Sequence, residues 1–148
     1  MSSSGSGVAM ACLVLVISCM VMPTLQHAVF TVGESIGWIP GFDYNAWAET
    51  KHFKVGDSLV FDYPSGLTVD EVFENDYNTC TVGNPITSDN SGSTTIPLLT
   101  AGPHYFICGV VGYCSRGMKL LVNVMAESTP LLSGRTPSLA TNTTASSP

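Results

Sequence analysis

Short runs of β-forming residues, separated by Gly, Asn, Asp and Ser, fill the middle of the chain and restrict the folds open to it. The clearest run is Ser58 to Tyr63, where apolar residues alternate after the turn residues Gly56 and Asp57. Pro97 cannot donate a ladder hydrogen bond, so its strand belongs at a sheet edge or beside a bulge. Many short strands with polar turns predict an all-β antiparallel sandwich. The other expected strands are 53–55, 67–72, 94–99, 104–108 and 119–125, and short helical turns are expected at 43–50 and 74–79.

The N-terminal segment differs from the middle of the chain. Residues 1–33 contain no charged side chain. Val8 to Met22 is an apolar run of about fifteen residues, which suits the core of a signal peptide and is shorter than the ~20 residues that span a bilayer. We therefore predict a signal peptide over residues 1–28, with an uncleaved N-terminal anchor as the alternative.

The C-terminal segment also has its own composition. Residues 127–148 are dominated by Ser, Thr, Pro, Ala and Leu, which cannot bury enough apolar surface to fold, so we predict a disordered tail. Asn142 begins an Asn-Thr-Thr acceptor for N-glycosylation. No hydrophobic segment of the kind that directs a GPI anchor follows, so we expect either a soluble extracellular protein or a longer natural chain. One folded domain is expected at 29–126.

Five cysteines divide between these regions. Cys12 and Cys19 fall within the predicted signal peptide and would be removed with it. Cys80, Cys108 and Cys114 remain, which is an odd number for a secreted chain, so one of them is expected to be left without an intramolecular partner.

One loop carries the most specific chemical signal. Its donors are spaced as Cys108-x4-Tyr113-x4-Met118, similar to the Cys-x4-His-x4-Met spacing of a blue-copper loop, which supplies a thiolate, an imidazole and a weak axial thioether. Further blocks between Phe30 and Val124 resemble the phytocyanins, the plant blue-copper and early nodulin-like family. These blocks are residues 30–33, 37–38, 44–47, 53–61, 68–72, 77–80, 104–108 and 117–120.

The resemblance implies a cupredoxin-like Greek-key sandwich stapled by one disulfide, between Cys80 and Cys114. In the chain-entropy model, closing a loop of about 35 residues stabilises the fold by roughly 3–4 kcal/mol. Cys108 is then the unpaired cysteine, as a ligand thiol would be.

The resemblance also locates a metal-site position at which this chain departs from the family. In copper-binding members the residue before Thr-Val-Asp-Glu-Val is the first histidine ligand, and here it is Leu67. Tyr113 stands where the second histidine is expected, so only Cys108 and Met118 match. A phenol ionises near pH 10, which makes a Tyr113 phenolate ligand costly, although a Cys–Met pair could still contact Cu(I). We therefore predict a degenerate copper site with no functional metal and no cofactor; bound copper is the alternative.

No group of residues predicts an enzyme. His52 and His104 are the histidines that remain after signal removal, and His104 lies four strand residues, or about 13 Å, from Cys108, which is too far for a Cys–His pair. Asp70 and Glu71 are strand neighbours and point to opposite faces, which disfavours a paired-carboxylate site. We assign no catalytic residue.

The remaining candidates are assigned structural roles. Trp38 and Trp47 match family positions and are expected in the core; a sugar-stacking platform would require them to be exposed. Arg116 beside the loop is expected to be solvated, with an anionic partner as the alternative. The formal charge of −6 disfavours nucleic acid and anionic membrane surfaces.

Together these observations predict a secreted or cell-surface protein of the copper-free, early nodulin-like kind. The resemblance implies a non-enzymatic binding, signalling or cell-wall module, with an extracellular protein or a cell-wall glycan as its partner. The alternative function is electron transfer through a variant copper centre, and a further possibility is that Cys108 serves as a redox-sensitive thiol.

Overall fold

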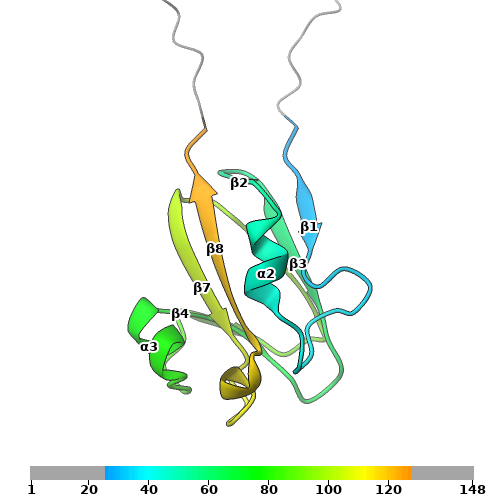
Figure 1. The fold of residues 1–148 in the computed structure, drawn as a ribbon, viewed down its shortest axis with the longest axis vertical. Coiled ribbons are helices and arrows are strands. Elements are labelled where there is room, and N and C mark those ends of the chain that lie inside the picture. The colour runs from blue at the N-terminus through cyan, green and yellow to red at the C-terminus, as the bar shows by residue number, and fades with distance from the viewer. Residues whose placement is uncertain (1–25, 128–148) are drawn as a thin grey trace, which may run out of the picture.

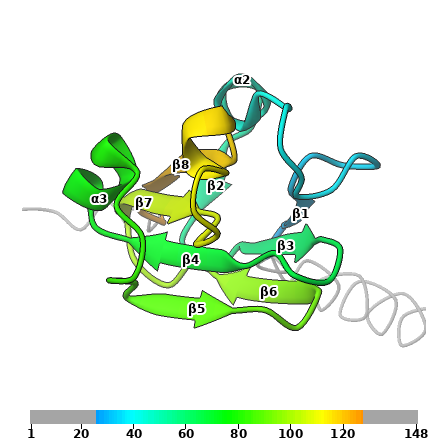
Figure 2. The same ribbon diagram turned by 90° about the horizontal axis from the view of Figure 1, so that it is seen from below.

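The computed structural model describes residues 26–127, which form two packed β-sheets (Figures 1 and 2). The smaller sheet has the strand order β1 (Val29–Thr31), β3 (Ser58–Asp62), β6 (Ser93–Pro97). The larger sheet has the order β2 (Phe53–Lys54), β8 (Lys119–Met125), β7 (Gly102–Ile107), β4 (Val69–Val72), β5 (Thr87–Asp89). The predicted all-β sandwich is confirmed. The predicted signal peptide (except residues 26–28), the predicted tail after Glu127 and Asn142 lie outside the described residues.

The core lies between the sheets because alternate residues of each strand face inward. In β3 the buried residues are Leu59 and Phe61, and in β8 they are Leu120, Val122 and Val124. This is the period of two that the strand pattern predicts. Aromatic rings join the layers, since the Phe61 ring lies 5.2 Å from that of Trp38 and 5.5 Å from that of Phe106, measured between centroids.

Most neighbouring strands are antiparallel, but two pairs are parallel. β1 runs parallel to β3, and β2 runs parallel to β8. A parallel pair needs a long crossover between its strands, and here each crossover exceeds twenty residues. No tight-turn motif in the sequence therefore predicts these pairings. β6, which contains Pro97, lies at the edge of its sheet, as predicted from that proline.

Two short α-helices flank the larger sheet. α2 (Tyr44–Glu49) begins at Asp43, whose side chain accepts a hydrogen bond from Ala46 N at 3.0 Å. α3 (Glu74–Thr79) ends at Cys80, which adopts a left-handed conformation with φ 52°. Neither helix is long enough to cross a membrane, and no other helix within residues 26–127 meets that requirement.

The loop singled out by its donor spacing lies at one end of the sandwich. It connects β7 to β8 and contains a single 3-10 turn, η1 (Cys114–Arg116). In Figure 1 this turn lies at the end opposite to the one where the chain enters at residue 26 and leaves at residue 127. The sandwich therefore separates the loop from both ends of the described chain.

Candidate functional site

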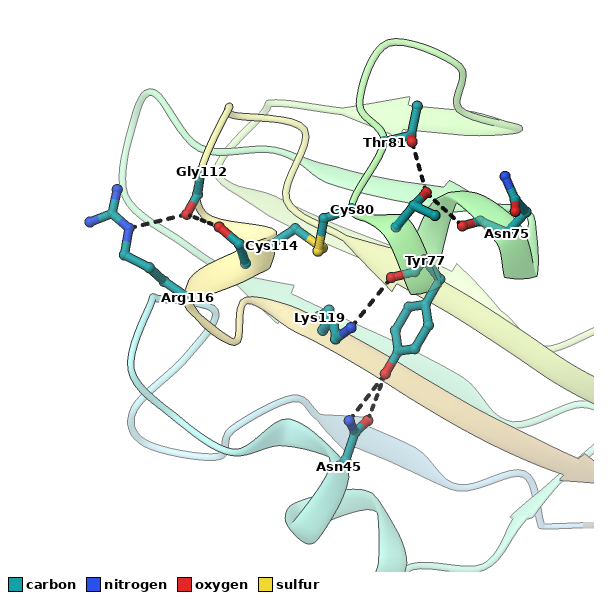
Figure 3. The surroundings of a disulfide bond; sticks show 11 residues. Asn45, Asn75, Tyr77, Cys80, Thr81, Gly112, Cys114, Arg116 and Lys119 are labelled. Carbon is teal, nitrogen blue, oxygen red and sulfur yellow. Dashed lines mark hydrogen bonds between the residues drawn. A yellow bond between two sulfur atoms is a disulfide. The ribbon is translucent and has the colours of Figure 1, made fainter.

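A disulfide fixes the β7–β8 loop to the end of α3. Cys80 and Cys114 are joined, with their Cα atoms 5.6 Å apart, which confirms the pairing that the family resemblance implied (Figure 3). Within the loop the Gly112 carbonyl accepts hydrogen bonds from Arg116 Nε at 3.1 Å and from Ser115 Oγ at 3.0 Å. The loop is thus held both covalently and by its own backbone.

Backbone hydrogen bonds bring the spaced loop residues together. Cys108 N donates to Met118 O, and Met118 N donates to Tyr113 O, both at 3.1 Å. These bonds fold the loop back so that the first and last of the three residues are adjacent. Cys108 and Met118 are fully buried, and the Tyr113 ring packs against the same core cluster while remaining partly exposed.

The segment before β4 reaches this cluster through Thr68. Gly109 N donates to Thr68 Oγ1 at 2.7 Å, and the Thr68 carbonyl accepts Trp38 Nε1 at 3.0 Å. A side chain at position 109 would overlap the carboxylate of Asp70, so glycine is needed for this approach. Leu67, next to Thr68, is 8% exposed and belongs to the same cluster as Cys108 and Met118. The structure therefore brings the segment that precedes β4 next to Gly109, the residue after Cys108.

The four predicted positions offer few donor atoms. Cys108 has a free, buried thiol, Met118 has a thioether, and Leu67 has no donor atom. Tyr113 offers a phenol, and the Arg116 guanidinium lies 4.7 Å from the centre of its ring. This stacking of Arg116 on Tyr113 was not predicted from the sequence; stacking is a common arrangement for an arginine beside an aromatic residue.

All three histidines of the chain lie in other surroundings. His104 Nδ1 lies 2.9 Å from Glu71 Oε1, and its Nε2 lies 3.0 Å from the Thr100 carbonyl, so both ring nitrogens face acceptors. His52 is exposed, and the ring of His27 rests on Gly56. Within residues 26–127, no three His, Cys, Asp or Glu side chains are grouped as a metal site would require.

The cluster supplies only part of the ligand set of a type 1 copper ion. Such a centre takes a thiolate, two imidazoles and a weak axial ligand. Cys108 and Met118 satisfy the first and last requirements. Leu67 and Tyr113 supply no imidazole, and among residues 26–127 no group of three His, Cys, Asp or Glu side chains could hold a metal ion instead. The donor set does not fit type 1 copper.

A polar network beside the disulfide was not predicted from the sequence. Asn45 Nδ2 of α2 donates to Tyr77 Oη of α3 at 3.0 Å, and Tyr77 Oη donates to Asn45 Oδ1 at 3.2 Å (Figure 3). The same Oδ1 accepts a hydrogen bond from Leu121 N of β8 at 3.0 Å. Lys119 Nζ lies 4.6 Å from the centre of the Tyr77 ring. Burial raises the pKa of Tyr77 above its ordinary value, so its hydroxyl stays protonated and can donate. Both helices are thus anchored to the larger sheet.

The other candidates from the sequence take up the expected positions. Trp38 and Trp47 are buried, at 0% and 8% exposure, so neither ring forms an exposed stacking platform. Asp70 accepts a hydrogen bond from Ser88 Oγ at 2.6 Å, whereas Glu71 pairs with His104. The two carboxylates therefore serve different partners and form no acid–base pair.

Comparison with known proteins agrees with this geometry. A family model described as a plastocyanin-like domain matches residues 38–118. The solved structure of cucumber stellacyanin with Cu²⁺ superposes with a TM-score of 0.62 at 32% identity, covering 69% of this chain and 99% of that one. The fold and the disulfide-braced loop therefore define a cupredoxin-like domain.

Relatives of similar sequence narrow the assignment from a cupredoxin-like fold to one protein family. A blue copper protein of Pisum sativum is 55% identical over 118 residues, which is 79% of this chain and 62% of that protein. Uclacyanin-2 of Arabidopsis thaliana is 42% identical over 107 residues, 71% of this chain and 53% of its own length. The chain belongs to the phytocyanin family, and it spans only somewhat more than half the length of these two relatives.

Proposed function

We propose that this phytocyanin has a degenerate type 1 copper site and acts without copper as a non-enzymatic extracellular binding module. The observation that carries the proposal is the donor set around Cys108, in which Leu67 and Tyr113 occupy the two places where the family resemblance puts imidazoles. Two of the three strong donors of a type 1 site are then lost. Structural zinc sites with four ligands are worth roughly 10–16 kcal/mol, so the loss of two strong donors removes a large part of any comparable binding free energy.

The packing of the pocket supports the same proposal. Without copper, a buried imidazole that lacks a partner would cost free energy in an apolar cluster. Leu67 avoids this cost and packs within the main core cluster, and Cys108 behaves as a small buried hydrophobic residue. Within the described residues, the one buried side-chain polar atom without a partner lies on Trp47 and not at this pocket. The cluster is thus stable as an ordinary core.

Titration with Cu(II), followed by visible absorbance, tests the proposal. We expect no intense thiolate-to-copper band from the purified secreted chain, while cucumber stellacyanin in the same buffer serves as the positive control. A strong band with one equivalent of copper would overturn the copper-free proposal. It would favour electron transfer through a variant centre, the alternative that the names of the relatives and the retained Cys108 and Met118 support.

The proposed location is outside the cell, in the secreted or surface-attached state expected from the signal-peptide pattern. The partner is then an extracellular protein or a cell-wall glycan. A tagged chain expressed in plant cells and recovered from the wall or medium, with residues 1–28 removed, would support this location; retention inside the cell would contradict it.

A further inference from the structure

A groove separates β1 from α2, away from the Cys108 pocket. Its volume is about 450 Å³, within the range of roughly 300–1,000 Å³ common for small-molecule sites. No residue of the β7–β8 loop contributes to it. It is lined by Val29, Phe30, Thr31, Glu34, Trp47 and Lys51.

The indole N–H of Trp47 is a donor without an acceptor. Among residues 26–127 it is the one buried side-chain nitrogen or oxygen that has no hydrogen-bond partner, and the residue is more than nine-tenths buried. Buried donors are nearly always satisfied, so an orphan donor at the wall of a groove points to a ligand. The other tryptophan, Trp38, is satisfied inside the domain by the Thr68 carbonyl.

Two opposite charges lie beside this donor. Lys51 Nζ is 2.9 Å from Glu34 Oε1 and 5.7 Å from the centre of the Trp47 ring. The hydrogen bond and charge of Lys51 lower the pKa of Glu34, and the Trp47 N–H adds a smaller contribution in the same direction. The indole N–H therefore lies close enough to the ionised Glu34 carboxylate to favour its charge, although the two groups do not meet the geometry of a hydrogen bond.

This arrangement selects the chemistry of a ligand. A hydroxyl group can accept from the Trp47 N–H and donate to the Glu34 carboxylate at the same time, which neither an anion nor an ammonium group can do. The negative charge of Glu34 would repel a free anion, and the positive charge of Lys51 would repel a free cation. The two charges already neutralise each other, so the groove favours a neutral ligand with several hydroxyl groups.

A second hollow lies beside α2 and the larger sheet. Its volume is about 240 Å³, it shares Lys51 with the first, and it carries Asn45, Glu49 and Asn123 at its wall. Because Lys51 lines both hollows, a chain of several linked units could occupy both, unlike a single small molecule.

We propose that the groove between β1 and α2 binds a neutral oligosaccharide, one of whose hydroxyl groups bridges Trp47 Nε1 and the Glu34 carboxylate. This names a ligand class for the extracellular binding role proposed above and rests on that role. Sugar binding and copper binding are measured separately, so failure of one leaves the other standing.

The test uses the two indole N–H signals of the ¹⁵N-labelled secreted chain, which has only two tryptophans. The chain is titrated with cellotetraose, xylotetraose, mannotetraose and β-1,4-galactotetraose, and separately with tetragalacturonate as an anionic ligand of equal length. We expect a saturable shift of the Trp47 signal with at least one neutral tetrasaccharide, while the Trp38 signal stays in place. The proposal is overturned if no neutral tetrasaccharide shifts the Trp47 signal, if both indoles shift together, or if only tetragalacturonate binds.

Variants with matched controls locate the contact. Glu34→Gln should weaken binding roughly tenfold, because the hydroxyl loses its hydrogen bond to a charged group. Lys51→Met should also weaken binding, because it removes the ion pair that holds the Glu34 carboxylate in place. Lys54→Met and Glu74→Gln remove exposed charges of the same kind that line neither hollow, and should leave affinity unchanged. Equal affinity in all four folded variants would overturn the assignment of the groove, even if the chain binds the sugar.

Discussion

Restoring both imidazoles to the Cys108 pocket is the most direct perturbation of the proposed degenerate site. The double variant Leu67→His, Tyr113→His would complete the donor set, because Cys108 and Met118 already share one cluster with position 67. The backbone bonds of the loop do not involve either replaced side chain, so the loop should keep its shape.

The cost of the change follows from burial. Leu67 is 8% exposed, and replacing it with histidine removes apolar packing and buries a polar ring, a loss of about 2–4 kcal/mol. Tyr113 is only partly buried, and its replacement should cost about 1 kcal/mol. The metal-free double variant is therefore expected to be clearly less stable than the parent chain.

Copper should reverse most of this loss. A ligand that binds only the folded state stabilises it by about 2.7 kcal/mol when its free concentration is 100 times the dissociation constant. Urea unfolding with and without Cu(II) measures the gain, and visible absorbance reports the copper–thiolate bond. Adding Cys108→Ser to the double variant is the control, and it should abolish the colour.

One outcome would refute the reasoning. If the double variant is folded but stays colourless, and copper does not raise its free energy of unfolding, positions 67 and 113 do not face Cys108 and Met118. The family correspondence at these two positions would then be wrong, and the absence of imidazoles would no longer explain a copper-free domain.

Further predictions concern stability and thiol access. Replacing Cys80 and Cys114 together by serine should lower the free energy of unfolding by roughly 3–4 kcal/mol in urea denaturation, and a loss below 1 kcal/mol would contradict the loop-closure argument. Cys108 should react with a thiol reagent only after denaturation, because it is fully buried; rapid native labelling would contradict this. Asn45→Ala should cost about 1–3 kcal/mol by leaving a β8 amide without its acceptor, whereas Asn75→Ala at an exposed position should cost little. Burial raises the pKa of Tyr44 above 10.0, so the folded state holds this proton more tightly and stability should fall as pH rises above about 10; Tyr44→Phe should flatten that fall, and an unchanged pH profile would count against it.

Local pattern predicted most of the strands, including the two-residue β2, but it did not predict β1 or β5. The alternation in Ser58 to Tyr63 corresponds to β3, and Pro97 indicated an edge strand, because both signals act within a few residues. β1 and β5 have three residues each and depend on partners far along the chain. The parallel pairing of β1 with β3 has no local signal, since its register is set by tertiary packing.

The candidate site was likewise only partly predictable from the sequence. The Cys80–Cys114 bridge followed from the family resemblance, which carries long-range information that periodicity lacks. The unpartnered N–H of Trp47 could not be foreseen, because hydrogen bonding of a buried indole depends on which atoms surround it in the fold. Family position predicted correctly that Trp47 is buried, but not what its nitrogen faces.

The placement of the chain ends has a consequence for how this molecule is presented. Residues 26 and 127 leave the domain at the same end, and the β7–β8 loop occupies the other (Figure 1). Attachment to any carrier through either terminus holds this loop at the tip farthest from the point of attachment. A binding partner that approaches along the long axis of the domain contacts this loop first. The hollows beside α2 include no residue of the loop, so a partner at the loop and a ligand in these hollows would contact different surfaces.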